Sequence, residues 1–127
     1  MTITDTELLE RAGAAASRAY APYSRFHVGC AVLTREGTVI EGVNVENAAY
    51  PLGVCAERTA FARAVAEGYR PGDFTVAAIT ASPCGGCRQW LAEMGVERVV
   101  FRNGGRVVTM TVDQLLPEQF EPSDLPE

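Results

Sequence analysis

Apolar residues in the first twenty positions recur at the spacing of a helix. Thr4 and Glu7 form a Thr-x-x-Glu capping box, so we expect this helix to begin directly after Thr4. It should end near Tyr20, because Pro22 disfavours helical geometry in the residue before it. The apolar side of this helix is predicted to consist of Leu8, Leu9, Ala12, Ala15, Ala16 and Ala19.

The next segment changes from helical spacing to the alternation of a strand. Apolar and polar positions alternate over residues 26–34, residues 35–37 (Arg-Glu-Gly) indicate a turn, and residues 38–45 return as a second strand. The two segments therefore predict a β-hairpin. One face of its first strand is expected to carry Phe26, Val28, Cys30 and Val32.

The rest of the chain mixes helical and strand patterns and contains no repeat or linker. Its elements are predicted to be a helix that begins near Cys55 and ends before Gly68 as its C′ residue, a strand at 74–80, a helix at 84–94, strands at 98–101 and 107–111, and a short helix at 113–116. The strand at 74–80 is a short apolar run, typical of a central strand covered on both faces. This order predicts an α/β fold in a single domain, residues 1–127, with a three-layer α/β/α architecture and a mixed, five-stranded sheet.

Composition and charge argue against several classes of partner. The chain of 127 residues has 11 Lys and Arg against 16 Asp and Glu, a formal net charge of −5. Scattered basic residues predict no binding to a nucleic acid polymer or to an anionic membrane. The longest uncharged stretch, residues 74–87, is interrupted by Pro and Gly and is too short to span a bilayer. The N-terminus lacks the pattern of a signal peptide, so we expect a cytoplasmic protein.

Three of the four cysteines are spaced as metal ligands. Cys84 and Cys87 form a Cys-x-x-Cys pair at the start of one predicted helix, and Cys55 lies 29 residues before Cys84, at the start of another. In a reducing compartment such cysteines bind metal or take part in catalysis more often than they form disulfides. Three thiolates can fill three positions of a tetrahedral Zn²⁺ site and leave the fourth for water. We therefore expect one zinc ion per chain.

Glu57 and Arg58 follow the first of these cysteines and suit the chemistry of such a site. Glu57 can take a proton from a metal-bound water and deliver it to a leaving group. Arg58 can donate hydrogen bonds to the thiolates and so offset their charge. Residues two apart point to opposite sides of a regular helix. Cys55 and Glu57 can therefore share one site only if Cys55 caps the helix.

The cysteines also allow two other interpretations. A Cys-x-x-Cys pair between a strand and a helix could belong to a redox protein of the thioredoxin type, which would cycle a Cys84–Cys87 disulfide. The cluster could instead be a structural zinc site in a non-catalytic interaction module, with His27 or Cys30 as the fourth ligand. Because His27 and Cys30 have opposite parity on one strand, at most one of them can face such a site.

Several segments of the chain resemble the zinc nucleoside deaminases, whose signature contains His or Cys, then x-Glu, then Pro-Cys-x-x-Cys. The more specific resemblance is to the small, tetrameric type of cytidine deaminase. It extends in order from about Tyr20 to Phe120, which is most of the chain. The segments that carry it are residues 20–29, 42–50, 55–58, 83–89 and 115–120.

The resemblance implies hydrolytic deamination of cytidine and 2′-deoxycytidine to uridine and 2′-deoxyuridine, with release of ammonia. Water activated at the zinc ion would attack C4 of cytosine, and Glu57 would act as the acid and base that protonates N3. Free nucleoside suits this acidic chain better than a polynucleotide, because nothing in the sequence neutralises phosphates. By position, the zinc ligands would be Cys55, Cys84 and Cys87.

The resemblance also implies a nucleoside pocket and a homotetramer. Asn44 and Glu46 would bind the ribose hydroxyls, which suits an amide and a carboxylate two residues apart on one strand face. Phe26 would flank the pyrimidine, and the backbone of Ala56 would contact the base near its amino group. The residues implied at the subunit junctions are Tyr50 and Phe120.

One departure from the family is the short connection before the Pro-Cys pair. Family members usually have a longer loop there, whereas the strand ending near Thr80 reaches Pro83 through only Ala81 and Ser82. We therefore expect a more open pocket wall near the amino group, unless a neighbouring subunit fills the gap. Deamination of modified or antibiotic cytosine nucleosides is accordingly an alternative function.

Overall fold

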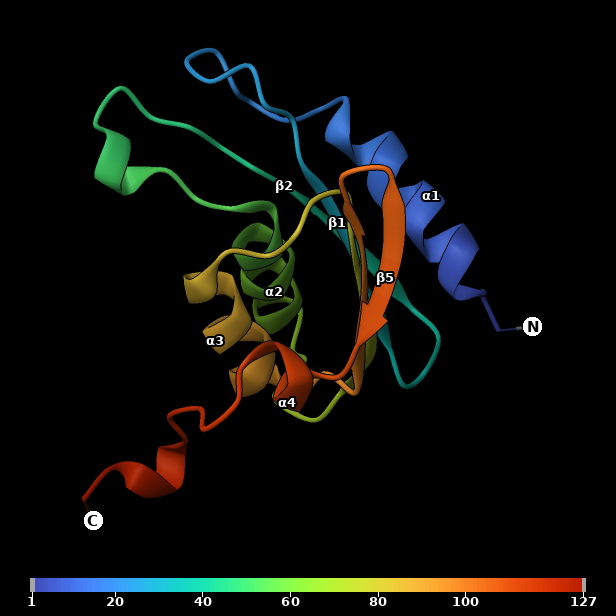
Figure 1. Ribbon diagram of the computed structural model, residues 1–127, viewed down its shortest axis with the longest axis vertical. Coiled ribbons are helices and arrows are strands. Elements are labelled where there is room, and N and C mark those ends of the chain that lie inside the picture. The colour runs from blue at the N-terminus through green and yellow to red at the C-terminus, as the bar shows by residue number, and fades with distance from the viewer. Residues whose placement is uncertain (1, 127) are drawn as a thin grey trace.

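The computed structural model describes residues 2–126, which form three layers (Figure 1). Helix α1 (Asp5–Ala16) packs on one face of a five-stranded sheet. The opposite face carries α2 (Ala56–Ala66), α3 (Gly85–Met94) and the short α4 (Val112–Leu115). The predicted α/β class and three-layer arrangement are confirmed. Met1 and Glu127, the ends of the predicted domain, lie outside the described residues.

The sheet consists of β1 (Gly29–Thr34), β2 (Val39–Val43), β3 (Phe74–Ile79), β4 (Arg98–Asn103) and β5 (Arg106–Met110). Its strands pair in the order β2-β1-β3-β4-β5. β3 runs parallel to β4 and the other neighbouring pairs are antiparallel, so the sheet is mixed, as predicted. β3 lies at the centre and is buried almost throughout, which explains its uninterrupted apolar sequence.

Helix α1 is shorter than predicted. Its capping box is present, because Thr4 and Glu7 each accept a hydrogen bond from the other's backbone N–H. The helix nevertheless ends at Ala16 rather than near Tyr20. The N–H of Tyr20 donates to the carbonyl of Asn44 at 3.0 Å instead of to the helix. Pairing with the segment after β2 therefore replaces the last predicted turn of α1.

The first strand begins at Gly29, three residues later than predicted. The side chain of Asn44 holds the residues before it: its Oδ1 accepts from the N–H of Val28 at 2.8 Å, and its Nδ2 donates to the carbonyl of Phe26 at 2.8 Å. Phe26 is consequently 62% exposed and does not continue the buried face of β1. A side chain thus supplies the hydrogen bonds that a strand ladder would have made.

The remaining boundaries lie close to the predicted ones. β2 ends at Val43, and Val45 continues only as isolated bridges to Tyr20 and Val54. β4 and β5 extend toward each other, so that Gly104 and Gly105 alone form the turn between them. Two short 3-10 turns that the pattern does not predict lie at Tyr50–Leu52 and Pro122–Asp124.

Two glycines allow the helices to lie directly on the sheet. A Cβ atom at Gly29 would overlap the carbonyl oxygen of Ala12 in α1, and one at Gly42 would overlap the backbone of Ala56 and Ala60 in α2. Separate apolar clusters fill the space under α1 and under the helices of the opposite face. The close approach at Gly42 fixes the first turn of α2 against β2, and this turn carries part of the candidate site.

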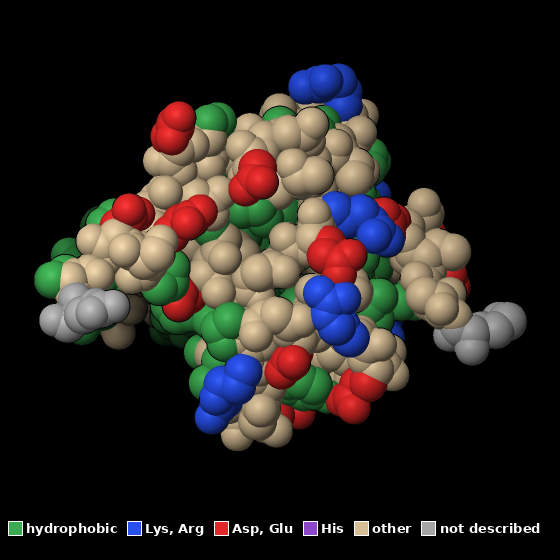
Figure 2. All heavy atoms as spheres, turned by 90° about the horizontal axis from the view of Figure 1, so that it is seen from below, with side chains coloured by type: hydrophobic (Ala, Val, Ile, Leu, Met, Phe, Trp, Pro, Cys, Tyr) green, Lys and Arg blue, Asp and Glu red, His purple; other side chains and the backbone are tan. Residues whose placement is uncertain are grey.

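Figure 2 shows one face of the molecule, on which acidic and basic side chains are interspersed. No continuous basic area covers this face, which agrees with the net charge of −5. Within residues 2–126, no helix combines the length and the apolar character needed to cross a membrane.

Candidate active site

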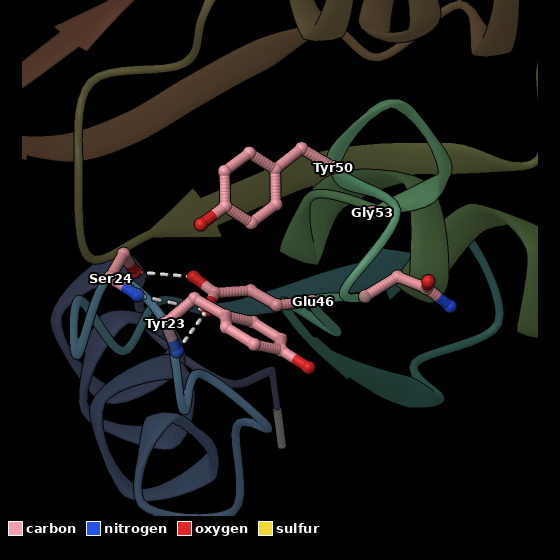
Figure 3. Close-up of a pocket in the computed structure, with 6 residues that line it drawn as sticks. Tyr23, Ser24, Glu46, Tyr50 and Gly53 are labelled. Atoms are coloured by element: carbon pink, nitrogen blue, oxygen red, sulfur yellow. Dashed lines mark hydrogen bonds between the residues drawn. The ribbon is translucent and has the colours of Figure 1, made fainter.

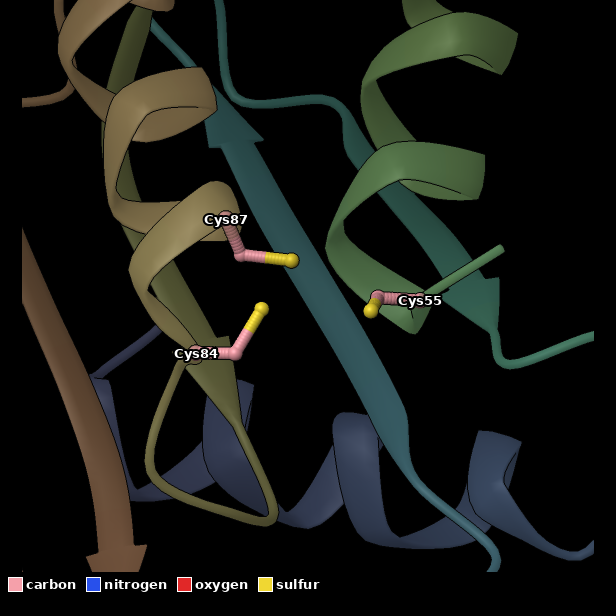
Figure 4. A group of neighbouring side chains, drawn as sticks. All are labelled: Cys55, Cys84 and Cys87. Atoms are coloured by element: carbon pink, nitrogen blue, oxygen red, sulfur yellow. The ribbon is translucent and has the colours of Figure 1, made fainter. Parts of the chain in front are cut away.

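The predicted metal ligands lie at the N-terminal ends of two neighbouring helices. Cys55 is the N-cap of α2 and Cys84 the N-cap of α3, both with extended backbone, and Cys87 lies in the first turn of α3. Figure 4 shows the three side chains converging on one space between the helices. The predicted cap position of Cys55 is therefore confirmed, and it allows Cys55 and Glu57 to face a common site.

The arrangement of the three thiols fits a metal ion. Their sulfur atoms all lie within 4.8 Å of one another. Tetrahedral zinc, with Zn–S bonds of about 2.3 Å, holds its sulfur ligands about 3.8 Å apart, so small side-chain rotations suffice to complete the set. The group is positioned to hold one metal ion, and three thiolate ligands leave a fourth coordination position for water or substrate.

Neither residue considered as a fourth ligand belongs to this group. Cys30 is fully buried in the apolar cluster beneath α2. His27 is exposed, and its Nδ1 lies 3.2 Å from the carbonyl oxygen of Arg25. Within the described part of the chain, the metal-ligand group consists of three cysteines only. The structure therefore gives no support to a closed, four-ligand structural zinc site.

Arg58 adds a positive charge beside the thiols. Partial burial disfavours the charged guanidinium, but a hydrogen bond to Cys87 and the charges of the three thiols outweigh this and raise the pKa of Arg58. The absence of a Cβ atom at Gly86 leaves room for the guanidinium, which that atom would contact. Its Nε is buried without a hydrogen-bond partner among the described residues. Arg58 is thus placed to offset negative charge on a thiolate cluster.

Glu57 supplies a carboxyl group in the first turn of α2. Its side chain is buried, with 4% of the residue exposed. Burial raises the pKa of Glu57, although its own backbone N–H, Cys87 and Arg58 act in the opposite direction. A carboxyl group whose pKa is raised toward neutrality can both accept and donate a proton, which general acid–base catalysis requires.

The three thiols differ in how readily they ionise. Burial raises the pKa of Cys55 and of Cys87. Burial also opposes ionisation of Cys84, but the backbone N–H groups of Cys87 and Gly86 and the neighbouring thiols outweigh it and lower the pKa of Cys84. The N-terminus of a helix stabilises a thiolate in this way. Binding of a divalent cation would bring all three groups into the thiolate form.

A cavity of about 250 Å³ opens beside the thiols. Cys55, Cys84 and Glu57 line it on the side of the helices, and the short connection after β3 contributes Ala81 and Ser82. Four of the residues predicted to contact substrate also line it, namely Phe26, Asn44, Glu46 and Ala56. The structure thus brings residues from four separate segments of the chain to one cavity.

Glu46 is held by the loop that precedes β1. Its carboxylate accepts hydrogen bonds from the N–H of Tyr23 (3.0 Å), from the N–H of Ser24 (3.1 Å) and from the hydroxyl of Ser24 (Figure 3). These hydrogen bonds, those of Ser24 first, lower the pKa of Glu46 and keep it ionised. Sequence reasoning missed Ser24, because its partner lies 22 residues away and no local spacing indicates the contact.

Tyr50 and Phe120 do not line this cavity. Tyr50 is 74% exposed and lines a neighbouring cavity of about 360 Å³, where its ring centroid lies 5.8 Å from that of Tyr23 (Figure 3). Phe120 is 56% exposed, and its carbonyl accepts a hydrogen bond from Gln89 Nε2 at 2.8 Å. Within one chain, therefore, these two predicted junction residues lie away from the thiols.

Comparisons with known proteins agree with this site. Residues 2–103 match the family described as "Cytidine and deoxycytidylate deaminase zinc-binding region". The chain is 43% identical to a cytidine deaminase of Sporosarcina psychrophila, over 94% of this chain and 93% of that one. It is also 43% identical to a cytidine deaminase of Halalkalibacterium halodurans, over 93% and 95%. The crystal structure of cytidine deaminase from Burkholderia pseudomallei superposes with a TM-score of 0.87 at 46% identity, covering 93% of this chain and all of that chain.

Proposed function

Because the chain belongs to the cytidine and deoxycytidylate deaminase family, we propose that it hydrolyses cytidine and 2′-deoxycytidine to uridine and 2′-deoxyuridine, releasing ammonia. One observation carries this proposal: Cys55 and Cys84 of the three-thiol group and the buried Glu57 carboxyl line the same open cavity. A purely structural zinc site has no use for a free coordination position beside a buried carboxyl group. A redox pair has no use for the third thiol, Cys55.

Cys55, Cys84 and Cys87 would hold the zinc ion, and Arg58 would offset the charge of their thiolates. The chemistry that zinc supplies when bound is Lewis-acid activation of a water molecule near neutral pH. The two helix N-termini that carry Cys55 and Cys84 place partial positive charge next to the thiolates. These features compensate for the strong electron donation of three sulfur ligands, which would otherwise weaken the acidifying effect of the metal.

Glu57 would move the protons of the reaction. Its carboxylate takes one proton from the attacking water and delivers it to N3 of the cytosine ring. A second proton, from the hydroxyl group now on C4, passes through the same carboxyl group to the exocyclic nitrogen. The C4–N4 bond then breaks, ammonia leaves, and C4 becomes a carbonyl. One water is consumed for each ammonia released, and Glu57 returns to its starting ionisation state.

Phe26, Asn44, Glu46 and Ala56 would position the nucleoside. A carboxylate has about four positions at which it can accept a hydrogen bond, and the loop at Tyr23 and Ser24 supplies three donors to Glu46. Glu46 therefore keeps capacity for one ribose hydroxyl. The exposed ring of Phe26 provides an apolar surface for the pyrimidine, and the backbone of Ala56 lies beside Glu57, where the amino group would be placed.

We also propose that the active form is a homotetramer, as the resemblance to the family implies, and that it acts in the cytoplasm. Large apolar side chains are exposed near the cavity, on the two segments that border Glu46, and a monomer rarely exposes so many together. A second copy covering them would bring Tyr50 or Phe120 to a neighbouring pocket. The side chains in question are Tyr20, Tyr23, Phe26, Tyr50 and Leu52.

The proposed function can be tested by measuring the zinc content of the purified protein and following the loss of ultraviolet absorbance of cytidine and deoxycytidine. We expect one zinc per chain and turnover of both nucleosides, abolished by a strong chelator and restored by added zinc. Bound zinc without turnover would indicate a structural zinc module. A metal-free protein that forms a Cys84–Cys87 disulfide would indicate a redox protein.

A further inference from the structure

The connection between β3 and α3 carries a ligand but has few contacts of its own. Residues 81–83 lie between the end of β3 and Cys84, outside any helix or strand. Pro83 has no N–H to donate, and no backbone–backbone hydrogen bond reaches residues 81–83 within the described chain. Cys84 itself is attached to α3, because its carbonyl accepts a hydrogen bond from the N–H of Arg88 at 3.0 Å. The three residues before Cys84 must be held by contacts other than secondary structure.

Arg88 supplies the hydrogen bonds that this connection lacks. Its Nε donates to the carbonyl of Pro83 at 2.9 Å, and one Nη lies 3.5 Å from the hydroxyl oxygen of Ser82. Its other Nη donates to the carbonyl of Leu115 at 3.0 Å, at the end of α4. The planar fork of a guanidinium can bind several acceptors in one fixed geometry, which a lysine ammonium cannot reproduce.

From these contacts we infer that Arg88 is a positioning residue for the metal centre, an inference that rests on the proposed zinc function. Arg88 joins the turn that bears Cys84 to the end of α4, which is itself packed through Val112 and Leu115 into the core beneath α3. The turn is thereby attached to the rigid interior. The side chain of Arg88 has no hydrogen bond to a thiol and does not line the cavity, so it would act only through the placement of Cys84 and of the cavity wall.

Arg88 and Arg58 have different partners and therefore different expected roles. Arg58 lies beside the thiols, whose charges raise the pKa of its guanidinium, so its charge acts on the ligands directly. The side-chain partners of Arg88 are instead the carbonyl groups of Pro83 and Leu115 and the hydroxyl group of Ser82. Loss of Arg88 should therefore change the geometry of the ligand set and its affinity for metal, and not the electrostatics of a correctly formed set.

The test compares Arg88→Ala and Arg88→Lys with Arg102→Ala, which removes an exposed arginine of β4 that does not line the cavity. The zinc dissociation constant is measured by competition with a chromogenic chelator. Co²⁺ is added separately, because its visible and near-ultraviolet absorption reports tetrahedral thiolate geometry. Thermal unfolding of each metal-free variant measures general destabilisation.

For Arg88→Ala we expect zinc binding about 10-fold weaker than in the wild type, in the range that supporting residues of metal sites commonly contribute. The Co²⁺ spectrum should shift or lose intensity. Arg88→Lys should recover part of the affinity, since an ammonium can serve one carbonyl but not both. Arg102→Ala should match the wild type in every measurement.

Wild-type zinc affinity and an unchanged Co²⁺ spectrum in Arg88→Ala would overturn the inference while leaving the proposed function intact. If Arg88→Ala does not fold, the same measurements on Arg88→Lys decide: wild-type zinc affinity and an unchanged Co²⁺ spectrum in that variant would overturn the inference. An affinity loss in Arg88→Lys without any change in the Co²⁺ spectrum would also contradict it, because geometry would then be unaffected. A wild-type protein that binds neither metal would overturn the proposed function itself.

Discussion

The two sides of the cavity are built very differently. On one side, Cys55, Glu57 and Cys84 lie at the N-terminal ends of α2 and α3, which pack on the sheet through a continuous apolar core. On the other, Phe26 and Glu46 belong to two loops with exposed aromatic side chains. The first side, which would hold the metal and move protons, is complete within one chain, and we call it the rigid side. The second side, which would hold the nucleoside, depends on side-chain hydrogen bonds and is open to solvent, and we call it the open side.

This contrast has a physical basis. The groups that bind metal and transfer protons must be held rigidly, and helix ends fixed to a sheet provide that rigidity. A pocket for a nucleoside must enclose most of its ligand, and a chain of 127 residues has little surface left with which to do so. A second copy of the chain could cover the side of the nucleoside pocket that is open to solvent in one chain.

The largest expected effect concerns the rigid side. Replacing Glu57 with Gln should leave zinc bound, because Glu57 is not a proposed ligand, but should remove the proton carrier. General acid–base groups contribute about 10²–10⁴-fold to turnover, and Glu57 would serve more than one step, so the loss should reach or exceed that range. Turnover near that of the wild type would show that the proton assignment is wrong. Zinc content of the same preparations separates this loss from metal loss.

Replacing Arg58 with Ala should produce the next largest effect. Without its charge beside the thiolates, turnover should fall about 10–100-fold, as for other residues that support metal ligands. Arg63→Ala provides a matched control on the same helix, since Arg63 is exposed and its partners are Glu67 and the carbonyl of Glu41. Unchanged turnover together with unchanged zinc affinity would remove Arg58 from the site.

The open side can be tested at the C-terminus. A chain that ends at Gln119 should bind nucleoside more weakly than one that ends at Phe120, because only the second keeps the aromatic ring proposed for a subunit junction. Thermal unfolding and zinc content should be similar for both. An effect on KM of a few-fold to 10-fold is expected from the loss of one apolar contact. Equal KM values for the two chains would exclude Phe120 from the pocket.

A smaller effect is expected in substrate selectivity. The connection after β3 lines the cavity with the small side chains Ala81 and Ser82. We expect N4-substituted cytidine to be turned over better, relative to cytidine, than by a family member with a longer loop at this place. Extra or missing carbon groups in a pocket change selectivity by about 10–200-fold at most. Identical discrimination by both enzymes would mean that another part of the assembly closes this wall.

The smallest expected effect is on stability and concerns the ion pair of Asp5 with Arg98, which lies outside the site. A hydrogen bond from Arg98 lowers the pKa of Asp5 below its ordinary 3.8, so this pair stabilises the fold above that pH. The contribution should be lost as the pH falls through the lowered pKa. Because both side chains are substantially exposed, Asp5→Asn should cost less than about 1 kcal/mol at neutral pH and nothing in strong acid. Denaturant unfolding at two pH values measures this, and cytidine turnover should not change.

The sequence predicts the rigid side better than the open side. The cap position of Cys55 follows from a local argument, namely that Cys55 and Glu57 cannot share a site within a regular helix. The central strand and the two cysteine-bearing helices likewise follow from apolar spacing. Local sequence patterns are sufficient to predict those elements whose position depends on burial of apolar residues and on helix geometry.

The open side depends on contacts between distant segments. The end of α1 and the start of β1 were predicted wrongly because Asn44 binds Tyr20, Phe26 and Val28 across the intervening chain. The contacts of Ser24 with Glu46, 22 residues away, and of Arg88 with Leu115, 27 residues away, have no signature in local spacing. Side chains such as Asn44 make hydrogen bonds that a neighbouring strand would otherwise make. Such contacts can be identified only when the folded structure shows which segments lie together.

The contrast between the two sides is tested most directly by diluting the protein until the proposed homotetramer dissociates. Sedimentation velocity gives the fraction of monomer, while zinc per chain and cytidine turnover per chain are measured on the same samples. We predict that zinc per chain stays at one throughout, whereas turnover at subsaturating cytidine falls in step with dissociation. A monomer that turns over cytidine as well as the assembly does would contradict the account.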